Sequence, residues 1–332
     1  MRVLITGGAG FIGSHLAERA LREGWRVAVL DNLSTGRRAN LTGLDLDFVE
    51  GDICDEPLVR RTMQGCDLVC HLAAAVGVPV ILKDVLGALR SNVRGTEVVL
   101  ETAAEYGIRV CLASSSEVYG RSDRLPFRED DASLLGPTSV ARWSYAAAKI
   151  VDEHLALAYR AQRDLPVSIV RYFNAYGPRT NLTGYASVIA VMIVQALRGE
   201  PITVYGDGSQ TRCFTYVTDM VEGTWRAATL DAAIGGVFNL GRPLETRIID
   251  LAQQIKQITG SASPVTGVPY EKIFGAKFQD VPRRVPDVSR ATEILGFRAS
   301  VSLEEGLRRT IDWIRESHDL LESPERTMRQ DH

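Results

Sequence analysis

The segment MRVLITGGAGFIGSHLAERA, residues 1–20, determines the fold expected for this chain of 332 residues. A short apolar run over residues 2–6 is followed directly by Gly8, Gly10 and Gly13, which satisfy G-x-G-x-x-G, and then by a helix-like stretch. At such a turn between strand and helix, glycine lets the backbone approach a pyrophosphate, and the helix N-terminus offers free N–H groups. This position, more than the three glycines themselves, predicts a dinucleotide-binding unit.

Short apolar runs alternate with stretches of helical periodicity over the first half of the chain. The predicted strands lie at residues 2–6, 26–30, 46–49, 68–72, 109–113 and 167–171. The predicted helices lie at residues 14–23, 56–63, 85–106 and 144–163. This alternation predicts an α/β fold, with a doubly wound parallel sheet of the Rossmann type that forms an NAD-binding domain over residues 1–175.

The pattern becomes less regular in the second half of the chain. We expect a smaller α/β C-terminal substrate lobe over residues 176–318, with part of the chain returning to the Rossmann domain. Its clearest elements are a helix over residues 186–198 and a strand over residues 202–205. The stretch 261–286 is rich in proline, glycine and charge and predicts a loop, and residues 319–332 predict a flexible tail.

Composition excludes several classes of function. A net charge of −3 gives no sequence-wide attraction to nucleic acid or anionic lipid, and no apolar window approaches a membrane-spanning length. The N-terminal apolar run is too short, and too soon broken by glycines, for a signal peptide. Five cysteines without a C-x-x-C pair indicate neither a disulfide framework nor a metal site. We therefore expect a cytoplasmic protein with no metal, nucleic-acid or membrane partner.

Two aspartates follow predicted strands at the edge where a dinucleotide would lie. Asp31 ends the second strand, where a carboxylate accepts hydrogen bonds from an adenosine ribose and repels a 2′-phosphate. It favours NAD over NADP, a preference that Arg37 and Arg38 weaken slightly. Asp52 follows the third strand and either caps a helix or contacts the adenine.

Tyr145 and Lys149 lie one helical turn apart in a predicted helix, so that both side chains share a face. A nearby ammonium stabilises the phenolate and lowers the pKa of a tyrosine from about 10 toward neutrality. A general base for alcohol oxidation needs such a pKa. Three alanines between the two residues leave room for a ligand.

A polar cluster stands at the C-terminal end of the fifth predicted strand, where ligands of open α/β sheets gather. It consists of the consecutive serines at 114–116 and Glu117. The serines either touch substrate or satisfy backbone groups of a turn. Glu117 is less easily explained as a turn residue, and we expect it to face the substrate.

The chain resembles the extended short-chain dehydrogenase/reductase family over nearly its whole length. The similar segments are the cofactor loop at 6–13, His71-Leu72-Ala73-Ala74, Asn92-Val93-Arg94-Gly95-Thr96, the Tyr145 and Lys149 pair, and the segments 171–179 and 204–212. The last two are similar to segments by which sugar-nucleotide members hold substrate. The resemblance therefore implies an enzyme that binds NAD and a UDP-sugar, and a homodimer formed through a bundle of the helices at 85–106 and 144–163.

The resemblance also implies which residues form each subsite. Cofactor contacts are expected from Gly7, Gly10, Phe11, Ile12, Gly13, Asp31, Asn32, Ser34, Thr35, Gly36, Asp52, Ile53, Leu72, Ala73, Ala74, Asn92, Tyr145, Lys149 and Tyr172. Substrate contacts are expected from Ser115, Glu117, Tyr145, Asn174, Arg179, Tyr205, Arg212 and Arg284. In this scheme Asn174 contacts the diphosphate, and Arg212 and Arg284 supply cations near phosphate or sugar.

Three reactions of the family must be separated: C4 epimerisation, 4,6-dehydration and decarboxylation of a uronic acid. Ser115 matches the family's catalytic Ser/Thr, but hexose dehydratases have an Asp-Glu pair where this chain has Ser116-Glu117. Ser-Glu before Val-Tyr-Gly, and the segment 142–145, are similar to UDP-glucuronate decarboxylases. We expect decarboxylation, with epimerisation as the main alternative and a non-catalytic NAD-binding regulator as the candidate from a different class.

The expected mechanism begins with Tyr145 as a phenolate that removes the C4 hydroxyl proton while hydride leaves C4 for NAD. Lys149 and Ser115 hold geometry and charge. A C5 carboxylate is then β to a ketone and can leave as carbon dioxide, with Glu117 and Arg212 as candidates for managing the developing charge and the C5 proton. Arg212 is equally suited to clamp the diphosphate. Both UDP-xylose and the released 4-keto pentose remain open as products.

Overall fold

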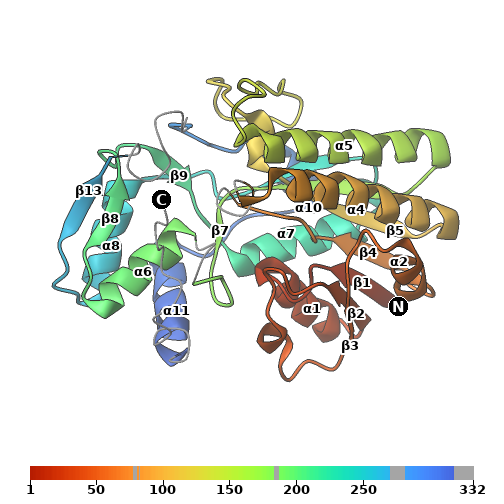
Figure 1. Ribbon diagram of the computed structural model, residues 1–332, viewed down its shortest axis with the longest axis horizontal. Coiled ribbons are helices and arrows are strands. Elements are labelled where there is room, and N and C mark those ends of the chain that lie inside the picture. Colours follow the sequence, from red (N-terminus) through yellow and green to blue (C-terminus); the bar gives the residue numbers. More distant parts are fainter. Residues whose placement is uncertain (78–80, 82, 183–186, 270–280, 318–332) are drawn as a thin grey trace.

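A computed structural model describes residues 1–77, 81, 83–182, 187–269 and 281–317 (Figure 1). Its centre is a seven-stranded sheet in the order β11-β6-β5-β4-β1-β2-β3, with every neighbouring pair parallel. These strands are β1 (Arg2–Thr6), β2 (Arg26–Asp31), β3 (Asp47–Glu50), β4 (Leu68–His71), β5 (Arg109–Ser115), β6 (Val167–Tyr172) and β11 (Val237–Leu240). The predicted doubly wound α/β sheet is confirmed.

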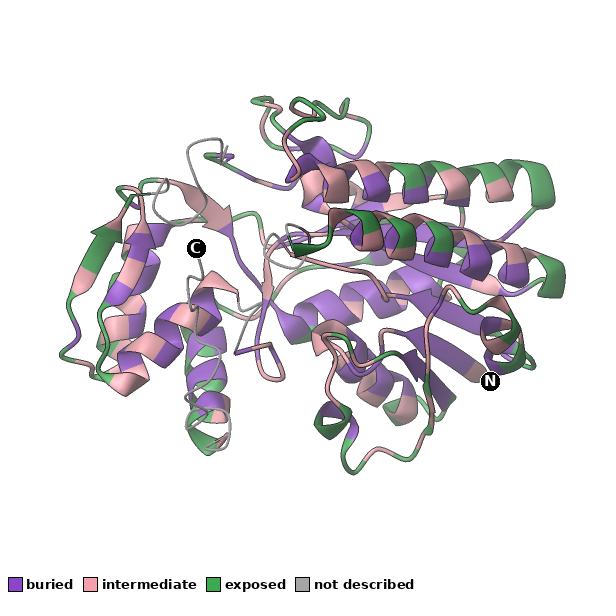
Figure 2. Ribbon diagram, viewed as in Figure 1, coloured by how far each residue is buried: buried purple, intermediate pink, exposed green. Residues whose placement is uncertain are grey.

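Helices cover both faces of this sheet. Leu4 and Leu30 pack on the side of α2 (Glu56–Met63), α4 (Val85–Tyr106) and α5 (Trp143–Arg163). Side chains of alternate position, Val3 and Ile5 among them, pack on the side of α1 (Phe11–Arg22) and α7 (Val217–Thr229). Burial on both faces explains why the strands are almost continuously apolar (Figure 2).

The predicted helices in the first half agree with the structure to within three residues. The largest difference is at α1, which begins at Phe11 instead of Ser14, because Gly10 in the glycine-rich loop already serves as its N-cap. β11 was not predicted. It pairs in parallel with β6, so the chain returns to the sheet after an excursion into the second lobe.

The second lobe lies at the left of Figure 1. It contains α6 (Val188–Arg198), β8 (Ile202–Tyr205), α8 (Ile248–Thr259), β13 (Val265–Val268) and α11 (Leu303–Glu316). The smaller elements of the chain are β7 (Ala175–Tyr176), β9 (Thr211–Cys213), β10 (Thr215–Tyr216), β12 (Glu245–Arg247) and α10 (Ser289–Leu295).

The expectation of a loop over residues 261–286 is wrong for residues 265–268. These residues form β13, which pairs in parallel with β8. The pairing partner lies about sixty residues earlier in the chain, and the short segment VTGV has no strong periodicity of its own, so local sequence could not show it. Residues 270–280 of the predicted loop and the predicted tail at 319–332 lie outside the described residues.

A buried polar network fixes the C-terminal end of β5. The Arg171 guanidinium on β6 donates to both carboxylate oxygens of Glu153 on α5, at 2.9 and 2.6 Å, and Ser114 on β5 donates to the same carboxylate at 2.5 Å. Arg171 also donates to the Tyr119 hydroxyl, which donates in turn to Asn239 on β11. The network joins three strands to α5 directly behind Ser115 and Glu117.

Candidate active site

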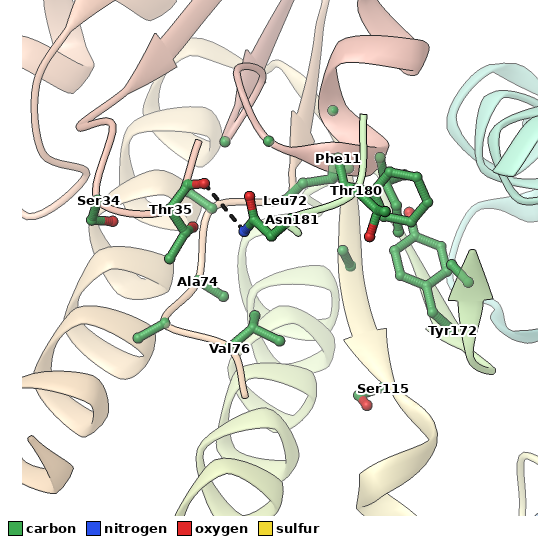
Figure 3. A pocket seen from close by; sticks show the side chains of 18 of the residues that line it. Phe11, Ser34, Thr35, Leu72, Ala74, Val76, Ser115, Tyr172, Thr180 and Asn181 are labelled. Carbon is green, nitrogen blue, oxygen red and sulfur yellow. Dashed lines mark hydrogen bonds between the residues drawn. The ribbon is translucent and has the colours of Figure 1, made fainter. Parts of the chain in front are cut away.

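A cavity of about 500 Å³ opens at the carboxyl edge of the sheet, between the sheet and the second lobe (Figure 3). Its lining comes from the glycine loop, the end of β2, the segment after β4, the end of β5, the start of α5 and the segments after β6. Parallel α/β sheets bind ligands at this edge. The cavity therefore lies where the sequence places the dinucleotide and the reacting sugar.

The glycine loop forms a close-fitting cradle. A Cβ on Gly13 would lie 2.2 Å from the Gly7 carbonyl oxygen, and a Cβ on Gly7, whose φ is +70°, would lie 2.7 Å from the Ala73 nitrogen. Only glycine fits at these two positions. Since α1 begins in the loop, the first N–H groups of a helix point at the cavity, and this suits a pyrophosphate.

Asp31 lies at the edge of the cavity with its carboxylate fixed by the backbone. It accepts hydrogen bonds from the N–H of Ala9 at 2.9 Å and of Leu33 at 2.8 Å, and burial raises its pKa. A Cβ on Gly36 would lie 2.9 Å from both carboxylate oxygens. Since a carboxylate has about four acceptor positions, Asp31 keeps capacity for ribose hydroxyls. Together with the glycine cradle, this acceptor fits NAD.

Asp52 does not cap a helix, because the N-cap of α2 is Asp55, whose carboxylate accepts from the Leu58 N–H. Asp52 instead accepts from the Asn32 side chain at 3.0 Å and from the Cys54 N–H at 2.8 Å. Its neighbours Gly51 and Ile53 line the cavity, whereas Asp52 itself does not. A contact between Asp52 and the adenine remains a prediction.

Sixteen of the nineteen residues predicted to bind cofactor line the cavity, and Gly36, Asp52 and Asn92 lie outside its lining. Those that line the cavity are Gly7, Gly10, Phe11, Ile12, Gly13, Asp31, Asn32, Ser34, Thr35, Ile53, Leu72, Ala73, Ala74, Tyr145, Lys149 and Tyr172. Asn92 lies behind the wall, where its amide exchanges two hydrogen bonds with the backbone of Ala75, at 2.7 and 3.1 Å. The Asn92 side chain thus shapes the segment that follows β4.

Three of the five predicted catalytic residues line the cavity, whereas Glu117 and Arg212 lie outside its lining. Ser115 comes from the end of β5, and Tyr145 and Lys149 come from the first two turns of α5. The Ser115 hydroxyl accepts a hydrogen bond from the Glu117 N–H at 3.2 Å, which places Glu117 next to it. Lys149 is buried and forms an ion pair with Asp152 at 3.1 Å. The Tyr145 phenol, the Ser115 hydroxyl and the Lys149 amino group thus line the same cavity.

Beside these groups the structure assembles a charged cluster around Glu117. Arg284 donates to the Glu117 carboxylate at 2.6 Å, and Arg142 lies 3.7 Å from its other oxygen. Burial by itself raises the pKa of the Glu117 carboxyl, but the charges of Arg284, Arg142 and Arg212 outweigh burial and hold that pKa below its usual value. Glu117 is therefore an ionised group, and the cluster as a whole has a positive charge.

Arg142 is a member of this cluster that the sequence did not indicate, and like Glu117 and Arg284 it lies outside the lining of the cavity. It is buried, and its guanidinium lies over the Trp143 ring, 5.3 Å from the centroid. The available signal is its position three residues before Tyr145, in the segment 142–145 that is similar to UDP-glucuronate decarboxylases. Its contact with Glu117, across twenty-five positions of the chain, appears only in the fold.

Of the other predicted substrate residues, Asn174, Arg179, Tyr205 and Arg212, only Asn174 lines the cavity. Asn174 lines the cavity at a φ of +40° and donates to the Cys213 carbonyl at 3.1 Å. Arg212 donates to the Thr211 and Pro282 carbonyls. Arg179 pairs with Glu18 on α1 at 2.8 Å, and Tyr205, at the end of β8, lies outside the lining of the cavity. Their contacts with substrate remain predictions.

Comparison with known proteins identifies the family. The model of the NAD dependent epimerase/dehydratase family matches residues 3–241. The chain belongs to this family. It is 44% identical to the UDP-N-acetyl-alpha-D-glucosaminuronate decarboxylase of Bacillus cytotoxicus, over 95% of this chain and 98% of that protein. It is 37% identical to the UDP-glucuronic acid decarboxylase 1 of Xenopus tropicalis, over 95% of this chain and 72% of that protein.

Solved structures of the family have the same architecture. The UDP-glucose 4-epimerase of Thermotoga maritima, solved with UDP-glucose, superposes with a TM-score of 0.88 at 32% identity, over 96% of this chain and all of that one. The UDP-glucuronic acid 4-epimerase of Bacillus cereus, in complex with UDP-glucuronic acid and NAD, superposes with a TM-score of 0.84 at 29% identity, over 96% of this chain and all of that one. Like the family, this protein is an NAD-dependent enzyme, and its cradle and Asp31 fit that cofactor.

Within 1–77, 81, 83–182, 187–269 and 281–317, no group of three or more His, Cys, Asp or Glu side chains could hold a metal ion. Over the same ranges no helix is long and apolar enough to cross a membrane.

The segment Pro178–Leu182, here called the strap, passes over the cofactor side of the cavity. It is tied to the Rossmann domain at three points: His15 Nε2 lies 3.0 Å from the Pro178 carbonyl oxygen, Arg179 pairs with Glu18, and the Asn181 amide donates to the Thr35 carbonyl at 3.3 Å (Figure 3). Thr180 and Asn181 also line the cavity. The sequence reasoning had not identified Asn181.

Replacing Asn181 with alanine is expected to raise the dissociation rate of NAD about five-fold, because one hydrogen bond that holds the strap is worth about 1 kcal/mol. Stopped-flow fluorescence of bound NADH measures this rate. The control is Gln195→Ala, which removes a hydrogen bond to Thr203 inside the second lobe and should leave the rate unchanged. Equal dissociation rates for the Asn181 variant and the wild type would show that the strap does not retain the cofactor.

A buried histidine behind the cavity makes the stability of the protein depend on pH. His71 lies between the hydroxyls of Thr6, at 2.7 Å, and Thr96, at 3.1 Å. Burial, with a smaller effect of the Lys149 charge, lowers its pKa to about 3. The unfolded chain binds a proton at His71 with a pKa of about 6.5, so below that pH the unfolded state holds more protons, and the free energy of unfolding falls.

We expect His71 alone to lower the free energy of unfolding by about 2 kcal/mol between about pH 8 and about pH 5. The loss continues until the pH reaches the folded-state pKa. Urea unfolding of wild type and His71→Asn at the two pH values isolates this contribution, since the variant lacks the titrating ring. If both proteins lose the same stability between the two pH values, His71 does not titrate as its burial requires.

Proposed function

We propose that this protein is an NAD-dependent UDP-glucuronate decarboxylase that acts through a 4-keto intermediate. The observation that supports this most is the cluster of Glu117 with Arg284 and Arg142 beside Ser115 and Tyr145. Its excess positive charge suits a substrate with a carboxylate in addition to its diphosphate, because arginine pairs two carboxylate oxygens at once. The names of the two decarboxylase relatives agree with this reaction.

The reaction starts at the C4 hydroxyl of the sugar. Tyr145 removes its proton, Ser115 donates a hydrogen bond to the C4 oxygen, and the Lys149 ammonium keeps the Tyr145 phenolate stable. Bound NAD supplies the acceptor that takes up hydrogen from C4 and later returns it. The protein's own groups thus hold the sugar with C4 ready for oxidation.

Loss of carbon dioxide follows from the C4 ketone. The C5 carboxylate is β to that ketone, so the electrons of the bond from C5 to the carboxyl carbon pass into the C4 carbonyl as the bond breaks. Ser115 and protonated Tyr145 face the negative charge that develops on the C4 oxygen. Arg284 and Arg142, fixed by Glu117, hold the carboxylate until the bond to C5 breaks. C5 of the resulting enolate then takes a proton from water, and the C4 ketone forms again.

The residue before Glu117 argues against 4,6-dehydration. Elimination of water needs a base that removes the C5 proton and an acid that protonates the departing hydroxyl, and the ionised Glu117 can serve only as the base. The preceding residue is Ser116, which is buried, so the acid pair expected in a dehydratase is missing. Epimerisation uses the same C4 chemistry and remains the main alternative, because only rotation of the ketone distinguishes it.

A second substrate is favoured by the relative from Bacillus cytotoxicus, whose name specifies a 2-acetamido sugar and which matches nearly end to end. UDP-N-acetylglucosaminuronate has the same C4 hydroxyl and C5 carboxylate as UDP-glucuronate, so the proposed chemistry applies to both. The two differ only in the C2 substituent. The test therefore includes both uronates.

The decisive experiment incubates the protein and NAD with UDP-glucuronate, UDP-N-acetylglucosaminuronate or UDP-glucose, followed by mass spectrometry. Loss of the carboxyl mass from either uronate supports decarboxylation, and the mass of two further hydrogens separates UDP-xylose from the 4-keto pentose. An unchanged mass with a new sugar configuration would establish an epimerase. NAD binding without turnover of any of the three would indicate a regulator instead of an enzyme.

We also propose a homodimer that pairs α4 and α5 of two copies. Apolar side chains are exposed on α5, where Val151 is 42% exposed and Leu157 is 37% exposed. Apolar residues on a helix face favour pairing through a two-fold axis. Val151→Glu is expected to convert a dimer into a monomer, measured by light scattering after gel filtration. Leu230→Glu, at a similarly exposed leucine after α7, is the control that should stay dimeric.

The cysteines support the cytoplasmic location that we propose for the enzyme. All five are free thiols, and four of them are buried. Burial raises the pKa of the Cys111 thiol to about 11, and that of Cys70 well above its usual value. Such thiols are inert and need no disulfide to stabilise the fold, as expected in a reducing compartment.

A further inference from the structure

Lys149 has a buried carboxylate as its partner. Asp152, one turn further along α5, is completely buried, and its carboxylate lies 3.1 Å from the Lys149 ammonium, whose side chain is 4% exposed. Asp152 does not line the cavity, whereas Lys149 does. The carboxylate thus lies on the protein side of Lys149, away from any ligand.

The groups that face Asp152 from neighbouring elements are uncharged. Thr96 on α4 lies next to the Asp152 carboxylate, and its hydroxyl is hydrogen-bonded to His71 on β4. Burial raises the pKa of the Asp152 carboxyl, and the Lys149 charge opposes that shift. His71 is neutral, since burial lowers its pKa to about 3. On α5 itself, the neighbouring Glu153 is paired with Arg171. Among the described residues, Lys149 is therefore the cation paired with Asp152.

Burying the charges of Lys149 and Asp152 costs desolvation free energy, which suggests that the pair has a role in function. Two charges removed from water contribute little net stability, and such a pair is often replaced by apolar residues without loss. A buried ammonium without a counterion, however, releases its proton far more readily than an exposed one. The chemistry at Tyr145 needs the charged form of Lys149, because a neutral amine would not stabilise a phenolate.

Distance makes Asp152 a partner of Lys149 and not of Tyr145. Tyr145 is four residues before Lys149, about 6 Å along the helix, whereas Asp152 is seven residues from Tyr145, about 10 Å along it. The Asp152 charge acts on Lys149 at contact distance and only weakly on the phenol. Its effect on the reaction must pass through the ammonium.

We propose that Asp152 is a positioning residue that keeps Lys149 protonated and fixed beneath Tyr145, an inference that rests on the proposed C4 oxidation. Asp152 touches neither sugar nor cofactor. It supplies the negative charge that allows an ammonium to exist at a buried place. The turn of α5 after the catalytic lysine is thus part of the catalytic apparatus.

The low number of lysines makes a direct test possible. The chain has five: Lys83, Lys149, Lys256, Lys272 and Lys277. Labelling them with 13C at Cε and following their resonances with pH shows the protonation of each in the intact protein without substrate, and Lys149→Arg assigns the resonance of Lys149. The variant is Asp152→Asn, which keeps the shape and removes the charge. The matched control is Asp164→Asn at the exposed C-cap of the same helix.

In Asp152→Asn the Lys149 resonance is expected to titrate about one to three pH units lower than in the wild type, the range that loss of an adjacent opposite charge produces. Asp164→Asn should titrate like the wild type. If Lys149 titrates at the same pH in Asp152→Asn and in the wild type, the proposal is overturned. Should Asp152→Asn fail to fold, deprotonation of Lys149 near neutral pH in the wild type would overturn it equally.

Turnover gives a second readout. The alkaline limb of the kcat profile should move toward neutral pH in Asp152→Asn by a similar amount, while KM for the sugar nucleotide changes less than about two-fold, because Asp152 does not reach the cavity. A purely structural role would lower kcat equally at every pH, and that result would contradict the proposal. The resonance titration needs no substrate, so it remains decisive even if the wild type decarboxylates neither uronate and the proposed function itself fails.

Discussion

Tyr145→Phe is expected to lower kcat for carbon dioxide release by a factor of about 10²–10⁴, the contribution of a positioned general base. The variant keeps the ring that lines the cavity and loses only the hydroxyl. Without that hydroxyl no group takes the C4 proton, so the sugar is not oxidised and the later bond cleavage cannot start. Release of carbon dioxide from labelled UDP-glucuronate, together with the absorbance of reduced cofactor, measures both consequences.

Tyr159→Phe provides the matched control on the same helix. Its hydroxyl donates to Glu101 on α4, two turns of α5 or more beyond Lys149 and away from the cavity. The control should keep the wild-type kcat. Full activity of Tyr145→Phe would refute the assignment of the base and, with it, the proposed mechanism.

Glu117→Gln is expected to separate the two halves of the reaction. C4 oxidation depends on Tyr145, Ser115 and Lys149, and should continue at a similar rate. Carbon dioxide release should fall about 10²-fold, because Arg284 and Arg142 lose the charge that holds them at the C5 carboxylate. Reduced cofactor should therefore accumulate after substrate is added, and rapid-mixing absorbance shows it as a stable signal in place of a transient one.

The control for this variant is Glu245→Gln, which removes another ionised carboxylate paired with an arginine, Arg283, on the exposed strand β12. It should release carbon dioxide at the wild-type rate. An equal loss of oxidation and carbon dioxide release in Glu117→Gln would mean that Glu117 positions the whole sugar. Unchanged carbon dioxide release would remove it from the mechanism.

Much of the site could be predicted because its parts are local in the sequence. The glycine loop, the acidic end of β2 and the spacing of Tyr145 and Lys149 each depend on a few consecutive residues in one element. Parallel strands bring their carboxyl ends to a common edge, so residues at the ends of β1, β2, β4 and β5 were expected to meet there. The cavity lining contains residues from all four.

The contacts that the sequence did not predict join positions that lie far apart in the chain. Arg284 lies 167 residues from Glu117, and the Asn181 amide crosses 146 residues to reach Thr35. Neither contact leaves a pattern in the nearby sequence, because the residues next to an arginine or asparagine do not show which distant residue its side chain contacts. Arg142 was not among the predicted site residues for the same reason.

By itself, the sequence determined the layered α/β architecture, the glycine cradle and the placement of Tyr145 and Lys149 on one helix face, since helix and strand periodicity and the steric needs of glycine act over a few residues. Only the tertiary structure decided that the arginines around Glu117 hold the pKa of its carboxyl below the usual value, that β11 and β13 are strands, and that Lys149 and Asp152 are buried as a pair. The reason is physical: burial and the field of distant charges set protonation and pairing, and both exist only when the chain is packed.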